Sequence, residues 1–308
     1  MQSTEKVDSL SEKIKLLKKQ RRAVILSHFY QRPEIQEIAD FVGDSLELSK
    51  KAAATDAEVI VFCGVHFMAE SAAILSPDKV VLLPEKNAGC PMADMIDAEA
   101  LQSKKSQIPG AVVVCYVNTS AEVKAESDIA CTSANAVKII NSIPRENPIL
   151  FVPDKNLGRY VAGKTNRDNI TVWEGFCNTH DQLTRSELLK AKGEHPQALV
   201  LVHPECRPDV VALADVVAST SGMLKYAQES SCREFIVGTE NGILHQFLKR
   251  CPDKRFYPAS NKMVCPNMKA TTLEKVHRAL LTMEPQITVS ASIREKAVKS
   301  LERMLAIQ

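Results

Sequence analysis

Three cysteines recur at nearly equal intervals along this chain of 308 residues. Cys90, Cys177 and Cys265 are separated by 87 and 88 residues, and each lies in a loop with little apolar bulk. The chain holds nine cysteines but no C-x-x-C pair, which argues against a zinc ribbon and a thioredoxin-like redox pair. Three thiolates brought together suit either one zinc ion with an open fourth position or a 4Fe–4S cluster with one iron that lacks a protein ligand. The spacing therefore predicts a three-cysteine metal site, and the other six cysteines are interpreted as small buried hydrophobes.

The same interval separates segments that end in acid–base and hydroxyl side chains. Three runs rich in Val, Ile and Leu, at residues 23–30, 111–118 and 198–205, are typical of strands buried on both faces. Equivalent places near the strand ends hold His28, Tyr116 and His203, and equivalent places at predicted helix starts hold Ser45, Ser133 and Ser221. In parallel sheets ligands bind at the carboxyl ends of the strands, so these side chains are candidates to line one cavity.

The repeat also predicts the architecture. Further strands are expected at 59–63, 149–153 and 235–239, and again just before each of the three cysteines. Strands that alternate with helices indicate parallel sheets covered on both faces. We therefore predict an α/β fold of three homologous α/β/α sandwich domains, with short parallel sheets around a pseudo-threefold axis and a central active-site cavity.

The predicted domains follow the repeat boundaries. Residues 1–105 and 270–308 are assigned to the first domain, 106–192 to the second and 193–269 to the third. Two helical patterns near the C-terminus, at 271–283 and 290–305, have no counterpart in the repeat. We expect both of them to pack, with the N-terminal helix, on the first domain.

Composition excludes several classes of partner. The 39 basic and 37 acidic residues give a net charge of only +2, so no global field attracts nucleic acid or an anionic membrane. The one basic run, residues 15–22, lies where apolar residues recur at helical spacing, which predicts the exposed face of an amphipathic helix. No apolar stretch is long enough to span a bilayer or resembles a signal peptide, so a cytoplasmic protein is expected.

Four short motifs resemble the quinolinate synthase family. They stand in the family's order and spacing at residues 88–95 (AGCPMADM), 173–180 (WEGFCNTH), 202–205 (VHPE) and 265–269 (CPNMK). The resemblance implies a transferase of NAD biosynthesis that condenses iminoaspartate with dihydroxyacetone phosphate to quinolinate, phosphate and water. It also implies one 4Fe–4S cluster held by Cys90, Cys177 and Cys265, whose open iron acts as a Lewis acid in dehydration. Because iminoaspartate is unstable, functional coupling to an aspartate-oxidising enzyme is expected.

The resemblance and the strand-end positions together give the candidate site residues. The expected catalytic residues are Tyr30, Glu205, His203 and Thr220, with Thr220 as a partner of Tyr30. The expected substrate-binding residues are His28, Ser45, Tyr116, Asn118, Ser133, His203, Glu205, Ser219 and Thr220. His180 also matches a family position, without a clear role. A lone serine at a helix start is usually only an N-cap, so the hydroxyl assignments depend on a shared cavity.

Two other functions stay open at this level. A zinc lyase or hydrolase on the same scaffold would use the three cysteines and a bound water. A binding module without catalysis would hold a small anion and use the cysteines to sense iron or oxygen.

Overall fold

Three parallel sheets of four strands each form the framework of the chain. The computed structural model describes residues 2–307, with side chains described from residue 9. The first sheet contains β1 (Ala23–His28), β2 (Phe41–Gly43), β3 (Val59–Cys63) and β4 (Val80–Leu82). The second contains β5 (Val112–Tyr116), β6 (Ile129–Cys131), β7 (Ile149–Val152) and β8 (Ile170–Val172). The third contains β9 (Leu199–Val202), β10 (Val216–Val217), β11 (Glu234–Gly238) and β12 (Arg255–Pro258).

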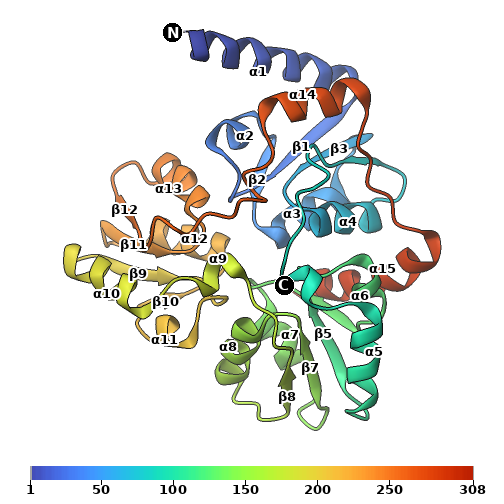
Figure 1. Cartoon of the computed structure of the whole chain (residues 1–308), viewed down its shortest axis with the longest axis vertical. Coiled ribbons are helices and arrows are strands. Elements are labelled where there is room, and N and C mark those ends of the chain that lie inside the picture. The colour runs from blue at the N-terminus through green and yellow to red at the C-terminus, as the bar shows by residue number, and fades with distance from the viewer. Residues whose placement is uncertain (1, 308) are drawn as a thin grey trace.

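The three sheets share one topology. Their strand orders are β2-β1-β3-β4, β6-β5-β7-β8 and β10-β9-β11-β12, and every pairing is parallel. Figure 1 shows the three units arranged around a common centre. The predicted α/β fold of three repeated units is therefore confirmed.

Helices cover the sheets and join their strands. Those of the first part of the chain are α1 (Gln2–Gln20), α2 (Pro33–Ile38), α3 (Ser45–Ala54), α4 (His66–Leu75) and α5 (Ala98–Ser106). Those of the middle part are α6 (Ala121–Ala125), α7 (Ala136–Ser142), α8 (Lys155–Thr165), α9 (Asn178–Asp181) and α10 (Arg185–Glu194). Those of the last part are α11 (Pro208–Val211), α12 (Thr220–Glu229), α13 (Leu244–Arg250), α14 (Leu273–Thr282) and α15 (Ala291–Ala306). Two single turns of 3₁₀ helix occur at Ala93–Met95 and Asn241–Ile243.

The second strand of each sheet escaped the sequence analysis. β2 and β6 have three residues and β10 has two, too few to show a hydrophobic period. Each follows an aspartate whose carboxylate accepts a 2.8 Å hydrogen bond from a backbone amide of the neighbouring strand. The pairs are Asp40 with Ile25, Asp128 with Val113, and Asp215 with Val200. This recurring aspartate, spaced by 88 and 87 residues, was the available signal.

The core consists of the central strands and the helices that cover them. Every residue of β3 is buried, and so is every residue of β7, because both faces of these strands lie under helices. The apolar face of α1 buries Ile14 in a cluster with Leu273 and Val276 of α14, while Lys15 and Lys19 are exposed. The basic run is therefore the exposed side of an amphipathic helix, as predicted.

Each cysteine loop leads into a helix that lies against the next unit. α5 lies alongside α6, α10 packs on α11 and β11, and α14 packs on α1 and β3. The three units are thus linked in a ring, with α14 closing it on the first unit. The expected placement of the 271–283 helix agrees with this. Because α5 and α10 contact the following unit, we propose domain boundaries just before these helices instead of after residues 105 and 192.

The last helix differs from its expected place. α15 packs chiefly on α6 and β6 of the second unit and touches α4 of the first. Its buried side chains Ala297, Leu301 and Met304 belong to a core shared with Val123 of α6. The placement of residues 290–305 on the first domain is therefore corrected, since the apolar stripe of this helix packs on α6 and β6 of the second unit. Within the described part of the chain, no helix is both long and apolar enough to cross a membrane.

Candidate active site

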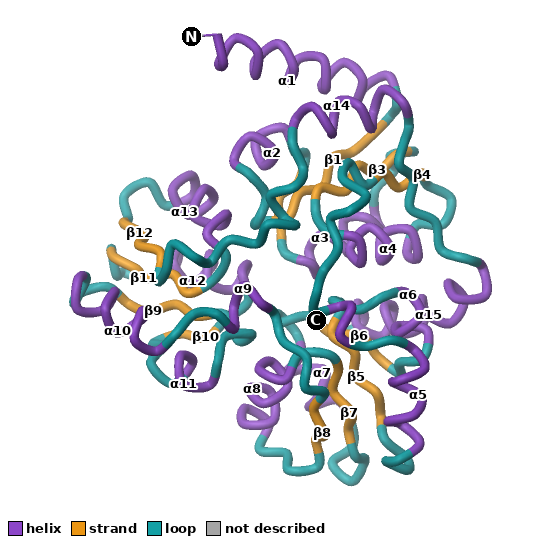
Figure 2. The backbone as a smooth tube through the Cα atoms, in the orientation of Figure 1, coloured by secondary structure: helices purple, strands orange, loops and turns teal. Residues whose placement is uncertain are grey.

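A cavity of about 160 Å³ lies between the three units, lined by the ends of strands and the starts of helices. Figure 2 shows the loops that follow the strands converging at the centre of the molecule. All of the predicted site residues except Ser219 line this cavity: His28, Tyr30, Ser45, Cys90, Tyr116, Asn118, Ser133, Cys177, His203, Glu205, Thr220 and Cys265. They come from all three units, as the pseudo-threefold repeat requires.

The three cysteine loops are tied to one another. The side-chain amide of Asn267, beside Cys265, donates to the carbonyl of Gly89 at 2.8 Å. On the opposite side the indole of Trp173 donates to the carbonyl of Met95 at 2.9 Å. These bonds hold the loops of Cys177 and Cys265 against the loop of Cys90.

The cysteine side chains themselves are half-buried and unpaired. Burial raises the pKa of Cys90 to about 12, and it also raises the pKa of Cys177 and Cys265. Thiolates at these positions therefore require a bound cation to be stable. At least one pair among these three described sulfur atoms lies more than 4.8 Å apart.

Two histidines near strand ends have their tautomers fixed by the backbone. Nδ1 of His28 accepts the amide of Tyr30 at 3.1 Å, and Nδ1 of His203 accepts the amide of Glu205 at 3.3 Å. Burial, with a smaller effect from Lys269 at His28, lowers the pKa of each imidazole to about 3. Both rings are therefore neutral near pH 7 and carry their proton on Nε2. Nε2 of His203 lies 3.1 Å from the hydroxyl of Ser133, so the pair can donate into the cavity.

A chain of four buried polar groups runs along one wall. The phenol of Tyr30 lies 2.6 Å from the Thr239 hydroxyl, which lies 2.8 Å from Nε2 of His180. Nδ1 of His180 lies 2.8 Å from Oε2 of Glu205. Because the carboxylate can only accept, Nδ1 carries a proton, and in the tautomer protonated on Nδ1 alone Nε2 accepts from Thr239. A proton can thus move between Tyr30 and His180 through one hydroxyl group.

The groups along this hydrogen-bond chain differ in charge. Burial opposes ionisation of Glu205, but His180, His203 and the phenol of Tyr116, which donates to Oε1, hold the pKa of the carboxyl below its usual range. Burial and the Glu205 charge raise the pKa of both Tyr30 and Tyr116 well above the ordinary phenol value. Glu205 is therefore a fixed anion, and the two phenols keep their protons at neutral pH.

Three predicted polar positions need separate comment. Ser219 lies outside the cavity lining because its hydroxyl caps α12, accepting from the amide of Gly222 at 3.2 Å. Thr220 lines the cavity as the first residue of α12, but the hydroxyl partner of Tyr30 is Thr239 instead. Asn118 faces the cavity with a buried Oδ1 that has no partner among the described residues, so it is a ready acceptor for a ligand.

Several residues at the ends of the third strands received no role from the sequence, Glu240 among them as an uncommitted neighbour of the cavity. Thr239 and Glu240 follow β11, and Asp154 follows β7, all with 0% exposure. The strand-end residues assigned to the site from the sequence all follow the first strand of a unit. Applying the same rule to the third strands would have found all three.

The fold and the site define a three-domain α/β enzyme built around one buried, thiol-lined acid–base cavity. The chain belongs to the quinolinate synthetase A protein family, whose family model matches residues 12–306. The quinolinate synthase of Desulforudis audaxviator is 61% identical over 300 residues, covering 97% of this chain and 99% of that protein. The quinolinate synthases of Methanoregula boonei and Methanosarcina barkeri are 57% and 56% identical, each over 97% of this chain and 98% of the relative. The family resemblance carried by the four motifs is therefore confirmed.

Proposed function

We propose that this enzyme condenses iminoaspartate with dihydroxyacetone phosphate and releases quinolinate, phosphate and two waters, a step of NAD biosynthesis. The observation that carries the proposal is the buried acid–base chain from Tyr30 to Glu205, which faces the same cavity as three cysteines. Membership of a family whose named members are quinolinate synthases supports the same reaction.

The cavity is suited to two anionic substrates. Ser45 and Thr220 are the first residues of α3 and α12, and both line the cavity. In α3 the carboxylate of Asp44 already accepts two backbone amides of the first turn, so Ser45 and Thr220 offer chiefly their hydroxyls to an anion. The Nε2–H groups of His28 and His203 add neutral donors. Since neutral donors hold an anion without adding a mobile proton, these residues serve in binding and orientation.

The three cysteines offer the donors that a 4Fe–4S cluster with one iron lacking a protein ligand requires. They line one cavity, and burial raises the pKa of each thiol, so a bound cation is needed to keep the thiolates. A second group of donors, Cys177, His180 and Glu205, lies within 4.8 Å, but the last two already belong to the hydrogen-bond chain. When bound, the cluster would supply an iron without a protein ligand as a Lewis acid for a departing hydroxyl.

The protein's own groups account for the proton movements. Ring formation needs one new carbon–carbon and one new carbon–nitrogen bond, and each loss of water pairs removal of a proton with protonation of a hydroxyl. Tyr30, whose phenol keeps its proton, is the group placed to donate. When the Tyr30 oxygen takes up a substrate proton, its own proton passes through Thr239 to Nε2 of His180, and the Glu205 carboxylate stabilises the imidazolium that forms. The reverse transfer returns the proton to Tyr30, which then protonates the departing hydroxyl.

The competing functions make different predictions about the site of this protein. A binding module without catalysis has no use for a buried chain of proton-transfer groups. A zinc lyase or hydrolase has no support among the named relatives, each of which is a quinolinate synthase. We therefore favour the synthase over both.

The decisive experiment measures iron, acid-labile sulfide and product on protein purified without oxygen. About four irons and four sulfides per chain, with quinolinate formed from both substrates, would support the proposal. Tyr30→Phe should keep the metal content but lower kcat by about a hundredfold or more. One zinc without sulfide, or tight substrate binding without turnover in the iron-loaded protein, would contradict it.

We also propose a supply route and a compartment. Iminoaspartate hydrolyses readily as an imine, so an aspartate-oxidising enzyme must supply it close to this one. All nine cysteines are free, which agrees with the reducing conditions of the cytoplasm.

A further inference from the structure

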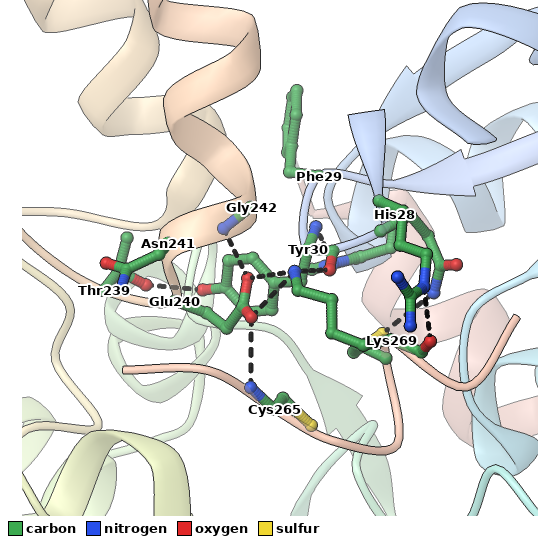
Figure 3. A network of polar contacts seen from close by, with 12 residues as sticks. His28, Phe29, Tyr30, Thr239, Glu240, Asn241, Gly242, Cys265 and Lys269 are labelled. Carbon is green, nitrogen blue, oxygen red and sulfur yellow. Dashed lines mark hydrogen bonds and ion pairs between the residues drawn. The ribbon is translucent and has the colours of Figure 1, made fainter. Parts of the chain in front are cut away.

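The buried carboxylate of Glu240 contacts the backbone beside a predicted cluster ligand. Its Oε1 accepts the backbone amide of Cys265 at 3.0 Å, and its Oε2 accepts the amide of Gly242 at 2.7 Å. Figure 3 shows Glu240 between these two amides and the ammonium of Lys269. The carboxylate has 0% exposure and is thus held entirely by the protein.

Lys269 connects this carboxylate to the first unit. Its Nζ lies 2.8 Å from Oε1 and 3.0 Å from Oε2 of Glu240, and it also donates to the carbonyl of Tyr30. The guanidinium of Arg32 donates to the carbonyl of Lys269 at 2.7 Å, which adds a second link to the same unit. One ammonium therefore joins the strand end that carries the phenol to the loop that carries the third cysteine.

There is little free space around this ion pair. A Cβ at Gly242 would come within 2.6 Å of Lys269 Nζ, 2.8 Å of Glu240 Oε2 and 2.9 Å of the carbonyl carbon of Tyr30. The contact with Tyr30 is to backbone, which cannot move aside easily. Close packing of this kind permits one arrangement of the pair.

The repeat provides an internal comparison. Asp154, at the equivalent strand end of the second unit, accepts the amide of Cys177 at 3.2 Å. In the first unit the equivalent region holds His66, whose amide donates to the carbonyl of Ala88 at 2.8 Å. Two of the three cysteine loops are therefore fixed by a buried carboxylate, and among the described side chains Glu240 alone of these two is paired with a cation that also reaches the neighbouring unit.

We propose that Glu240 and Lys269 are positioning residues that fix the Cys265 loop and the end of β1 relative to each other. Neither needs to touch substrate. Through these contacts the third thiol and the Tyr30 phenol keep their relative place across the boundary between the first and third units. The importance of this geometry for catalysis rests on the proposed function. The geometry itself can be tested independently of that function.

The test compares thiol accessibility in the full-length, metal-free chain. Each protein is treated briefly with iodoacetamide, and peptide mass spectrometry gives the alkylation rate of Cys265 relative to that of Cys90. Because Cys90 reports general loosening in the same sample, the ratio isolates the Cys265 loop. The variants are Glu240→Gln, Lys269→Met and Lys269→Arg.

A second ion pair provides the matched control. Lys249 of α13 and Glu37 of α2 also join the third and first units, at 2.8 Å, but on the surface and away from the cysteines. The variant Glu37→Gln/Lys249→Met thus removes a link between the same two units without touching the Cys265 loop.

The expected result is a ratio raised about tenfold in Glu240→Gln and Lys269→Met, the effect of losing a charged hydrogen bond that holds the loop. Glutamine has one acceptor for two amides, and methionine leaves the buried carboxylate without its cation. Lys269→Arg restores the charge and should bring the ratio back toward the unmodified protein. If Glu240→Gln fails to fold, the two Lys269 variants decide. A ratio within about twofold of the unmodified protein in Lys269→Met, or an equal rise in the control pair, would overturn the proposal.

A second readout concerns the metal-loaded protein. After reconstitution with iron and sulfide, Lys269→Met should shift the visible and electron paramagnetic resonance spectra, and Glu37→Gln/Lys249→Met should not. Identical spectra for Lys269→Met and the unmodified protein would contradict a role in placing the ligand. If the unmodified protein binds no iron and sulfide, the proposed cofactor fails, while the alkylation ratio still tests the positioning role.

Discussion

The Nδ1 atom of His180 lies 2.8 Å from Oε2 of Glu205, and both side chains are almost completely buried. An imidazole and a carboxylate at this distance, out of water, form a charge-assisted hydrogen bond whenever the ring is protonated. The pair also joins two units, since His180 follows Cys177 and Glu205 ends the first strand of the third unit. The chemistry of the cavity therefore depends on how the units meet.

Removing the charge of Glu205 should slow the reaction strongly. In Glu205→Gln the imidazole of His180 loses the anion that stabilises its protonated form, and Tyr116 loses a charged acceptor. We expect kcat to fall by about 10²- to 10³-fold, measured by quinolinate formation at saturating substrates with equal iron content. Glu234→Gln, a change far from the cavity on β11, should leave kcat unchanged. A Glu205→Gln enzyme with kcat near that of the unmodified protein would remove Glu205 from the proton-transfer chain.

Interrupting the relay at its middle should have a similar but smaller effect. Thr239→Val keeps the side-chain shape but removes the hydroxyl between Tyr30 and His180, whose Oη and Nε2 atoms lie 3.5 Å apart. We expect kcat to fall by about tenfold to a hundredfold, with KM and the cluster spectrum little changed. Thr239→Ser restores a hydroxyl and should recover most of the activity. Equal kcat for the valine and serine variants would show that the relay is not used.

Sequence could predict the parts of the site that follow the repeat. Parallel strands in equivalent units end at equivalent places, so a period found in cysteines and strand-end residues implied that His28, Tyr116 and His203 would face one cavity. The three cysteines follow the same rule, and the loops that carry them are indeed tied together. Such predictions succeed because they depend on topology, which the period determines.

Sequence could not predict contacts that break the repeat. Thr239 bonds to both Tyr30 and His180 because residues of three different units meet there, and no spacing within one unit encodes that. Likewise α15 follows the apolar side of β6 and α6, because an amphipathic helix after the last repeat carries no signal for which sheet it covers. The short strands β2, β6 and β10 were missed for a local reason, their length.

Acid should destabilise the folded chain through its buried histidines. The pKa of His28 and of His203 is lowered to about 3 from 6.5, so the unfolded chain binds protons that the folded chain does not. The resulting loss of stability is negligible well above pH 6.5 and grows as the pH falls from 6.5 toward 3. At pH 5 each histidine should lower the free energy of unfolding by about 2 kcal/mol relative to pH 7.

Urea unfolding of the metal-free chain at pH 5 and pH 7 measures this loss. His28→Gln should reduce the difference between the two pH values by about 2 kcal/mol, even if it changes stability at pH 7. Ser71→Ala, which removes a buried hydroxyl that does not titrate, is the control and should leave the difference intact even if it changes stability. A pH dependence identical in His28→Gln and the unmodified chain would show that His28 is not the buried neutral group described here.

Cluster assembly should distinguish ligand cysteines from core cysteines. Cys265 lines the cavity. Cys206 is instead buried among apolar side chains of the third unit, with its thiol near the carbonyl of Gly238. Cys265→Ser replaces a soft thiolate by a hydroxyl that binds iron poorly, so iron and sulfide per chain should fall to near zero after anaerobic reconstitution. Cys206→Ser keeps all three proposed ligands and should load fully, with only a modest loss of thermal stability. Full loading of the Cys265→Ser protein would mean that the cluster, if present, is held elsewhere, and the three-cysteine assignment would have to be given up.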